Sequence, residues 1–227
     1  MDIVNDNRIN CFYDWVKELT NNYKVIIVLG NHDINKSKKL KFYDVRDELY
    51  DKYISNLKEC NVFLINDNVY EDRFVRFVGF NLPVGAYYSS KNLEIEKNYY
   101  SSLDMSLFIS KKNKVNIAVI HSPINMFDED IRNILNNFDI ILTGHMHNGL
   151  VFSFIDRLFS DNRGLVSPSK KLFPKYSRNL VKLDLNKYLI ISGGITKLSK
   201  SSGMIRLFNF FYPMEIDEIN IKKKIKK

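Results

Sequence analysis

The chain has 227 residues, of which 45% are hydrophobic and 26% charged, so it can bury the core of a globular domain. This composition excludes a protein that is disordered over most of its length. No uncharged apolar run approaches the roughly 18 residues of a membrane-spanning helix. The net charge of +8 is uneven, because residues 170–227 hold 14 Lys and Arg against 4 Asp and Glu.

The first part of the chain alternates between helical and extended patterns. Apolar residues at helical spacing predict helices, and short runs of β-branched residues bounded by turn-forming residues predict strands. The elements expected here are helices over 8–21 and 44–60 and strands over 25–29, 61–65, 68–71 and 73–80.

The second part contains the most apolar strand candidates. The elements expected here are strands over 115–120 and 139–143, a helix over 129–136, a hairpin of 180–185 with 188–191, and a last strand over 215–221. We find no internal repeat or flexible linker, so residues 1–221 are predicted to form one domain, followed by a basic tail over 222–227. Mixed helices and strands favour a layered α/β sandwich.

Polar clusters that contain all four histidines follow three of the apolar runs. The clusters are Gly30-Asn31-His32-Asp33, His121-Ser122-Pro123 and Gly144-His145-Met146-His147. A single histidine of this kind is more often structural, but four at strand ends point to a shared site, because ligands bind at the carboxyl edge of α/β sheets. Imidazole, amide and carboxylate groups together suit borderline divalent metals.

The two histidines of the third cluster, His145 and His147, are two residues apart. On an extended strand their rings would point the same way, whereas a tight turn after Gly144 would direct them apart. Gly144 and Gly149 bracket the pair with the backbone freedom that such a turn needs. A site with two metals, each taking a ligand from this loop, would require that arrangement.

In their order and spacing, the three clusters resemble the signature motifs of calcineurin-like metallophosphoesterases. The resemblance implies a layered α/β/β/α sandwich with two mixed sheets. Residues 166–195 also resemble the end of the membrane-associated bacterial phosphodiesterase branch of that family. The family opens with an Asp-X-His motif that this chain lacks, so we expect the first strands and two metal ligands to be missing through truncation.

The resemblance also implies roles for individual residues. The ligands implied for one metal are Asn31, His121 and His145. The ligands implied for the other are His147 and Asp2, whose carboxylate would bridge both ions. His32, oriented by Asp33, would be the general acid. The metals expected are two divalent ions, Mn²⁺ foremost, with Fe or Zn as alternatives.

These roles predict a phosphodiesterase or phosphatase that uses a dinuclear centre and a metal-bridging hydroxide. Because one metal lacks two ligands, we expect the chain to hydrolyse a generic phosphodiester poorly or not at all. An in-frame Asp-X-His segment upstream would restore activity. The alternatives are a non-catalytic scaffold or inactive fragment, and a nuclease of the same superfamily.

The substrate predicted is a phosphoester that is lipid-linked or nucleotide-like. The apolar residues 152–155 and 158–159 follow the third cluster, and burial in the core is favoured over a groove for an acyl chain. A nucleic-acid partner is not favoured, because the basic residues show little stacking periodicity. The expected location is the cytoplasm or the membrane periphery. The basic end could attract anionic lipid or phosphate-rich ligands, but a solvated face with a frayed tail is the favoured interpretation.

Overall fold

The computed structural model describes residues 7–34, 48–123, 125–151, 162–166, 172–194 and 215–221. The elements up to residue 64 are α1 (Asn7–Thr20), β1 (Ile26–Ile27), α2 (Asn31–Ile34), α3 (Glu48–Glu59) and β2 (Phe63–Leu64). The following ones are β3 (Asn68–Glu71), β4 (Val75–Phe80), α4 (Gly85–Tyr88), α5 (Asn92–Ser102), the 3-10 helix η1 (Met105–Phe108) and β5 (Val115–Ile120). The last are α6 (Glu129–Ile134), β6 (Ile140–Thr143), the 3-10 helix η2 (His147–Leu150), β7 (Asn179–Asp184) and β8 (Lys187–Ile191).

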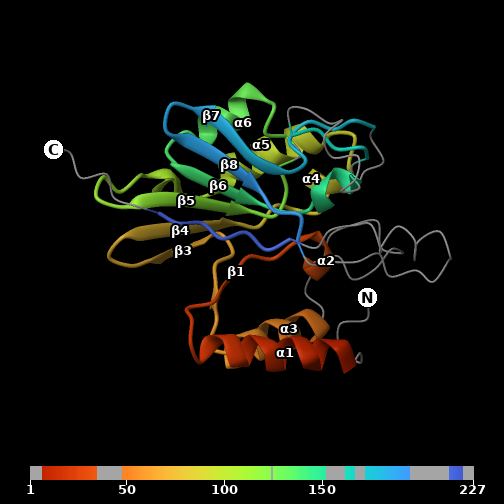
Figure 1. Cartoon of the computed structure of the whole chain (residues 1–227), viewed down its shortest axis with the longest axis vertical. Coiled ribbons are helices and arrows are strands. Elements are labelled where there is room, and N and C mark those ends of the chain that lie inside the picture. Colours follow the sequence, from red (N-terminus) through yellow and green to blue (C-terminus); the bar gives the residue numbers. More distant parts are fainter. Residues whose placement is uncertain are drawn as a thin grey trace.

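A small parallel sheet of β1 and β2 packs against α1 and α3, which lie side by side in Figure 1. Each of these helices buries one apolar stripe, as the helical spacing of its apolar residues requires. The buried residues of this small core are Tyr13, Val16, Leu29, Tyr53, Leu57 and Cys60. Leu29 immediately precedes the Gly30-Asn31 pair, so this core anchors the segment that carries Asn31.

The larger sheet has six strands in the order β3-β4-β5-β6-β8-β7. Its four central strands are parallel, while β3 and β7 run antiparallel to their neighbours at the two edges. The central strands are rich in Val and Ile because parallel strands are covered on both faces. Because these four strands run parallel, the chain leaves β4, β5, β6 and β8 at the same edge of the sheet.

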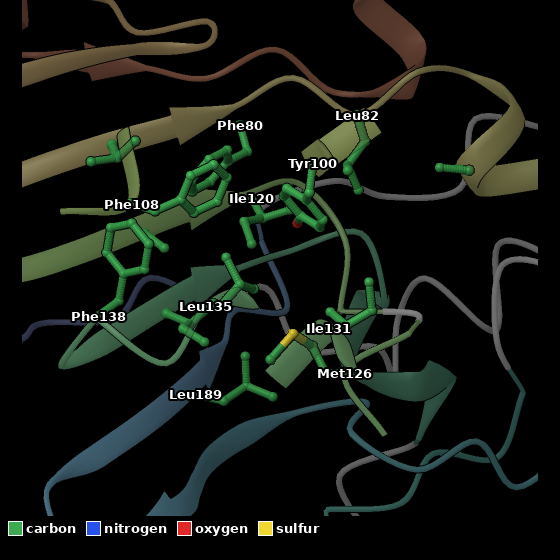
Figure 2. Packing of buried hydrophobic residues seen from close by; sticks show 14 of the residues in the cluster. Phe80, Leu82, Tyr100, Phe108, Ile120, Met126, Ile131, Leu135, Phe138 and Leu189 are labelled. Atoms are coloured by element: carbon green, nitrogen blue, oxygen red, sulfur yellow. The ribbon is translucent and has the colours of Figure 1, made fainter. Parts of the chain in front are cut away.

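Helices α4, α5 and α6 cover one face of the larger sheet and enclose the main core. Figure 2 shows how the buried side chains of this core pack. Phe80 lies at its centre, with ring centroids 5.4 Å from both Tyr100 and Phe108 and 5.8 Å from Phe138. Aromatic pairs at these separations add packing energy beyond the area they bury. None of the helices in the described part of the chain is long and apolar enough to cross a membrane.

The two sheets touch each other on the opposite face of the larger sheet. Val78 and Phe80 point into the main core, so Gly79 between them points toward the small sheet. A Cβ atom on Gly79 would lie 1.7 Å from the carbonyl oxygen of Ile65, which follows β2. Beside it, the Phe63 and Tyr70 ring centroids are 4.5 Å apart. The order helices, sheet, sheet, helices is therefore the predicted α/β/β/α sandwich, in which the described part of the small sheet is purely parallel.

Some expected elements differ from the structure. The strand predicted over 215–221 is wrong, because these residues are irregular and Ile216, Ile219 and Ile221 are all exposed, which leaves no buried face to support a strand. The strands expected over 25–29 and 61–65 shrink to the pairs that form β1 and β2. Helices α4 and α5 were not expected, and the basic tail over 222–227 lies outside the described residues.

Candidate metal centre

The carboxyl ends of β5 and β6 deliver two of the predicted ligands to neighbouring positions. Ile120 pairs with Thr143 at the ends of these strands, so His121 and Gly144 leave the sheet side by side. The Gly144 N–H donates to the carbonyl of His121 over 3.1 Å. This register places His145 one residue beyond the level of His121.

Three potential donor atoms lie close together at this edge. The Nε2 atom of His121 is 2.8 Å from Oδ1 of Asn31 and 3.2 Å from Nδ1 of His145. The two imidazole centroids are 5.0 Å apart at an interplanar angle of 69°. Asn31, which begins α2, is only 1% exposed. Residues from three separate segments thus turn one amide oxygen and two imidazole nitrogens toward a common point.

This donor set fits one divalent ion of the borderline kind, which accepts imidazole and oxygen ligands together. The fit depends on the Asn31 amide, because no group of three or more His, Cys, Asp or Glu residues that could hold a metal occurs in the described residues. Asp2 and the side chain of His32 lie outside the described part of the structure. Their assigned roles stay predictions, as does the second metal.

The loop that carries His145 and His147 has an unusual backbone. The Met146 N–H donates to the Gly144 carbonyl over 2.7 Å, which closes a γ-turn around His145 at a φ of 65°. His147 also has a positive φ of 47°, and the buried Met146 side chain between the histidines belongs to the main core. Left-handed conformations at non-glycine residues persist only where the surroundings impose them, and they concentrate at functional sites.

The two glycines of this loop behave differently from each other. Gly149 has a φ of 60°, and a Cβ atom there would lie 2.3 Å from the Cα atom of Gly164. Gly144 has ordinary room for a Cβ atom, with the nearest neighbour 3.9 Å away. The turn around His145 therefore does not depend on glycine at position 144, whereas the close approach of the chain at position 149 does.

The imidazole of His121 is enclosed on two sides. A Cβ atom on Gly30 would lie 2.7 Å from this ring, so only glycine allows the backbone before Asn31 to approach it. The ring centroid of Tyr87, from α4, lies 5.8 Å from that of His121 and 5.4 Å from that of His145. Tyr87 is 3% exposed, and burial raises the pKa of its hydroxyl. Glycine on one side and a neutral aromatic ring on the other hold the imidazoles in place.

Asp33 has contacts that define a structural role. Its carboxylate accepts hydrogen bonds from the Gly30 N–H over 2.8 Å and from the Tyr53 hydroxyl over 3.2 Å. The first bond satisfies a backbone donor at the start of α2 in the manner of a capping box. Tyr53 belongs to α3, so Asp33 ties the beginning of α2 to the small core. Its predicted role in orienting His32 is not tested by these contacts.

A buried carboxylate lies behind the loop that follows His121. Glu96, on α5, is 3% exposed and accepts a hydrogen bond of 2.6 Å from Nδ2 of Asn125, whose Oδ1 accepts one of 3.3 Å from Asn92. Burial is the largest cause that raises the pKa of Glu96 to about 7, with Asp128 adding to it and the bond from Asn125 opposing it. Near neutral pH this group therefore changes its charge inside the protein.

We expect Glu96→Gln to remove a component of the pH dependence of stability. The folded-state pKa of about 7 exceeds the ordinary 4.5. The contribution of Glu96 to the free energy of unfolding therefore falls as the pH rises from 4.5 to about 7, and it does not change at higher pH. The shift corresponds to roughly 3 kcal/mol at most. Denaturant-induced unfolding at pH 5 and pH 8 measures the free energy of unfolding. Relative to the wild type, this free energy should be higher for the variant at pH 8 than at pH 5. Glu94→Gln, an exposed change on the same helix, is the control; an equal pH response in all three proteins would contradict the prediction.

Two residues of this region carry no recognisable motif in the sequence. Tyr88 accepts a short hydrogen bond from Nδ2 of Asn31, and Glu96 supports Asn125. A weak signal exists for Tyr88, since the Tyr87-Tyr88 pair follows β4, which ends at the same sheet edge as β5 and β6. No comparable signal exists for Glu96, because a glutamate in an amphipathic helix is ordinarily exposed.

Comparison with known proteins identifies a family for this architecture. The model of the calcineurin-like phosphoesterase family matches residues 1–149, which is more than half of the chain and includes all three histidine clusters. No curated protein and no solved structure matches the chain. The match, the sandwich of two sheets and the order of the clusters agree with one another. The chain therefore belongs to the calcineurin-like phosphoesterase family.

Proposed function

We propose that this protein is a metal-dependent phosphoester hydrolase whose centre is built around Asn31, His121 and His145. The observation that carries the proposal is the approach of the Asn31 and His145 donor atoms to within 2.8 and 3.2 Å of one nitrogen of His121. Membership of the family supports phosphoester hydrolysis in general. The convergence of donor atoms from three segments on one point supports a ligand-binding site at this position.

The chain's own residues would divide the work as follows. Asn31, His121 and His145 would hold one divalent ion, and His147 with Asp2 would contribute to a second, Mn²⁺ being the metal we favour and Fe or Zn the alternatives. Such ions make water acidic enough to act as a nucleophile near neutral pH and polarise phosphoryl oxygens. Tyr87 and Gly30 would keep the imidazoles in register.

His32 would supply the proton that the leaving group needs. It follows Asn31 directly in α2, so its backbone lies next to the residue whose amide oxygen faces His121. A general acid that protonates the departing alkoxide contributes roughly 10²- to 10⁴-fold in rate. A protein that only bound a metal would have no use for this residue.

For the substrate we propose a phosphodiester that is lipid-linked or nucleotide-like. Support comes from the excess of basic residues over 170–227 and from the resemblance of residues 166–195 to the membrane-associated branch, which lies beyond the family match. Phosphate groups and anionic lipid surfaces are both attracted by such a charge distribution. The apolar residues 152–155 and 158–159 lie outside the described residues.

The test is hydrolysis of bis-p-nitrophenyl phosphate by the purified chain, measured beside its metal content. We expect slow release of nitrophenol that requires Mn²⁺, stops on addition of a chelator, returns when Mn²⁺ is restored and is lost in His121→Ala. Bound Mn²⁺ without any turnover, both in this chain and after addition of an Asp-X-His segment, would instead support the rival function, a non-catalytic metal-binding scaffold. Turnover that survives the chelator and His121→Ala would refute the proposed centre.

A further inference from the structure

The amide of Asn31 has a partner on each side. Its Oδ1 faces Nε2 of His121 at 2.8 Å, and its Nδ2 donates a short hydrogen bond to the hydroxyl of Tyr88. Tyr88 is the last residue of α4, and α4 lies at the same end of the sheet as α2 in Figure 1. The Tyr88 hydroxyl therefore contacts the nitrogen of this amide, whereas the metal centre would use the amide oxygen.

The orientation of this amide decides what it can bind. The oxygen and nitrogen ends of an asparagine side chain have nearly the same shape, so a rotation by 180° exchanges an acceptor for a donor without steric change. The rotated amide would present N–H groups to His121, and an amide N–H does not ligate a cation. Asn31 is 1% exposed, so water offers little competition for its Nδ2 atom. The Tyr88 hydroxyl accepts from the Nδ2 end and so keeps the side chain where its oxygen faces His121, while a bound cation would itself select the oxygen end over the nitrogen end.

We propose that Tyr88 is a positioning residue of the metal centre, whose hydroxyl holds the Asn31 amide with its oxygen toward His121 and His145. The inference rests on the proposed function. It assigns Tyr88 a role that its neighbour cannot share, because Tyr87 acts through its buried ring and Tyr88 through its hydroxyl.

The exposure of Tyr88 makes this role separable from packing. Its side chain is 56% exposed, and it is absent from both buried apolar clusters, so the ring contributes little to the core. Tyr88→Phe keeps the ring and removes only the hydroxyl. The fold should therefore tolerate the change, with a thermal midpoint of the metal-free protein within about 2 °C of the wild type.

The experiment measures Mn²⁺ affinity in the full chain by the electron paramagnetic resonance of free Mn²⁺. We expect Tyr88→Phe to weaken binding by roughly 10- to 100-fold, the usual effect of losing a partner that orients a metal ligand. Tyr23→Phe removes the hydroxyl of another exposed tyrosine, in the turn that follows α1, and should leave the affinity unchanged.

A double-mutant cycle with Asn31→Ala shows whether Tyr88 acts through the amide. In that background the additional effect of Tyr88→Phe should vanish, because there is no amide left to orient. An affinity of Tyr88→Phe within twofold of the wild type, or an equal loss in both backgrounds, would overturn the inference while leaving the metal centre standing. Failure of the wild-type chain to bind Mn²⁺ would overturn both the inference and the proposed centre.

Discussion

In a protein extended by an Asp-X-His segment, His32→Ala is expected to slow hydrolysis of an alkyl phosphodiester by roughly 100-fold or more, with bound Mn²⁺ unchanged. The alkoxide that leaves from such a substrate is strongly basic, so its departure depends on a proton from the enzyme. His32 is placed beside Asn31 by α2 but is not among the proposed ligands. Turnover and metal content, measured on the same preparations, check both halves of this expectation.

Substrates with different leaving groups separate acid catalysis from general damage to the site. A nitrophenolate leaves with little need of protonation, so activated esters should lose much less than alkyl esters in His32→Ala. Equal losses for both classes, together with loss of bound metal, would instead reassign His32 as a ligand. That outcome would refute the proposed mechanism and leave the family membership intact.

Gly30→Ala is expected to weaken Mn²⁺ binding at least as much as the loss of an orienting partner, which is roughly 10- to 100-fold. The new methyl group would lie 2.7 Å from the His121 ring, a separation that real Cβ atoms essentially never show. The ring cannot retreat freely, because Tyr87 and His145 lie beyond it. It must therefore leave the position in which its Nε2 atom meets Asn31. Titration with Mn²⁺ measures the effect.

Gly144→Ala is the matched control for this substitution. It introduces the same methyl group at the start of another ligand loop, where the nearest atom is 3.9 Å away and the backbone needs no positive φ. Its Mn²⁺ affinity should stay close to that of the wild type. If both alanine variants bound Mn²⁺ normally, the His121 ring would have to be more adaptable than its neighbours in the structure allow.

The parts of the fold that could be predicted are those in which local pattern and burial agree. Residues 115–120 form β5 as expected, because a run of Val, Ile and Ala suits a strand covered on both faces. His121 and His145 meet because the parallel strands β5 and β6 end at a common edge, and Asn31 reaches them from the segment that follows β1 of the small sheet. The strand predicted over 215–221 is absent because its apolar residues are exposed. An alternation of apolar and polar residues indicates a strand only where other elements bury the apolar side chains.

The contacts that tune the site could not be predicted, because they depend on how distant segments pack. Tyr88 reaches Asn31 across 57 positions of sequence, and Asn125 reaches Glu96 across 29. Tyr88, Glu96 and Asn125 belong to no motif, and each residue type is ordinary at its position. The γ-turn at His145 was foreseen only as a need for a tight turn, and its left-handed backbone is imposed by the tertiary structure.

The placement of the three donors links ligand binding to the cohesion of the whole sandwich. Asn31 is anchored by the small core, whereas His121 and His145 leave the larger sheet, so the two halves meet at the His121 imidazole as well as at Gly79. An ion held by all three side chains would cross-link the small sheet and its helices to the larger sheet. At a free concentration one hundred times its dissociation constant, it would add about 2.7 kcal/mol to the free energy of unfolding. That stabilisation would fall on the junction between the sheets, which neither sheet's own hydrogen bonds reinforce.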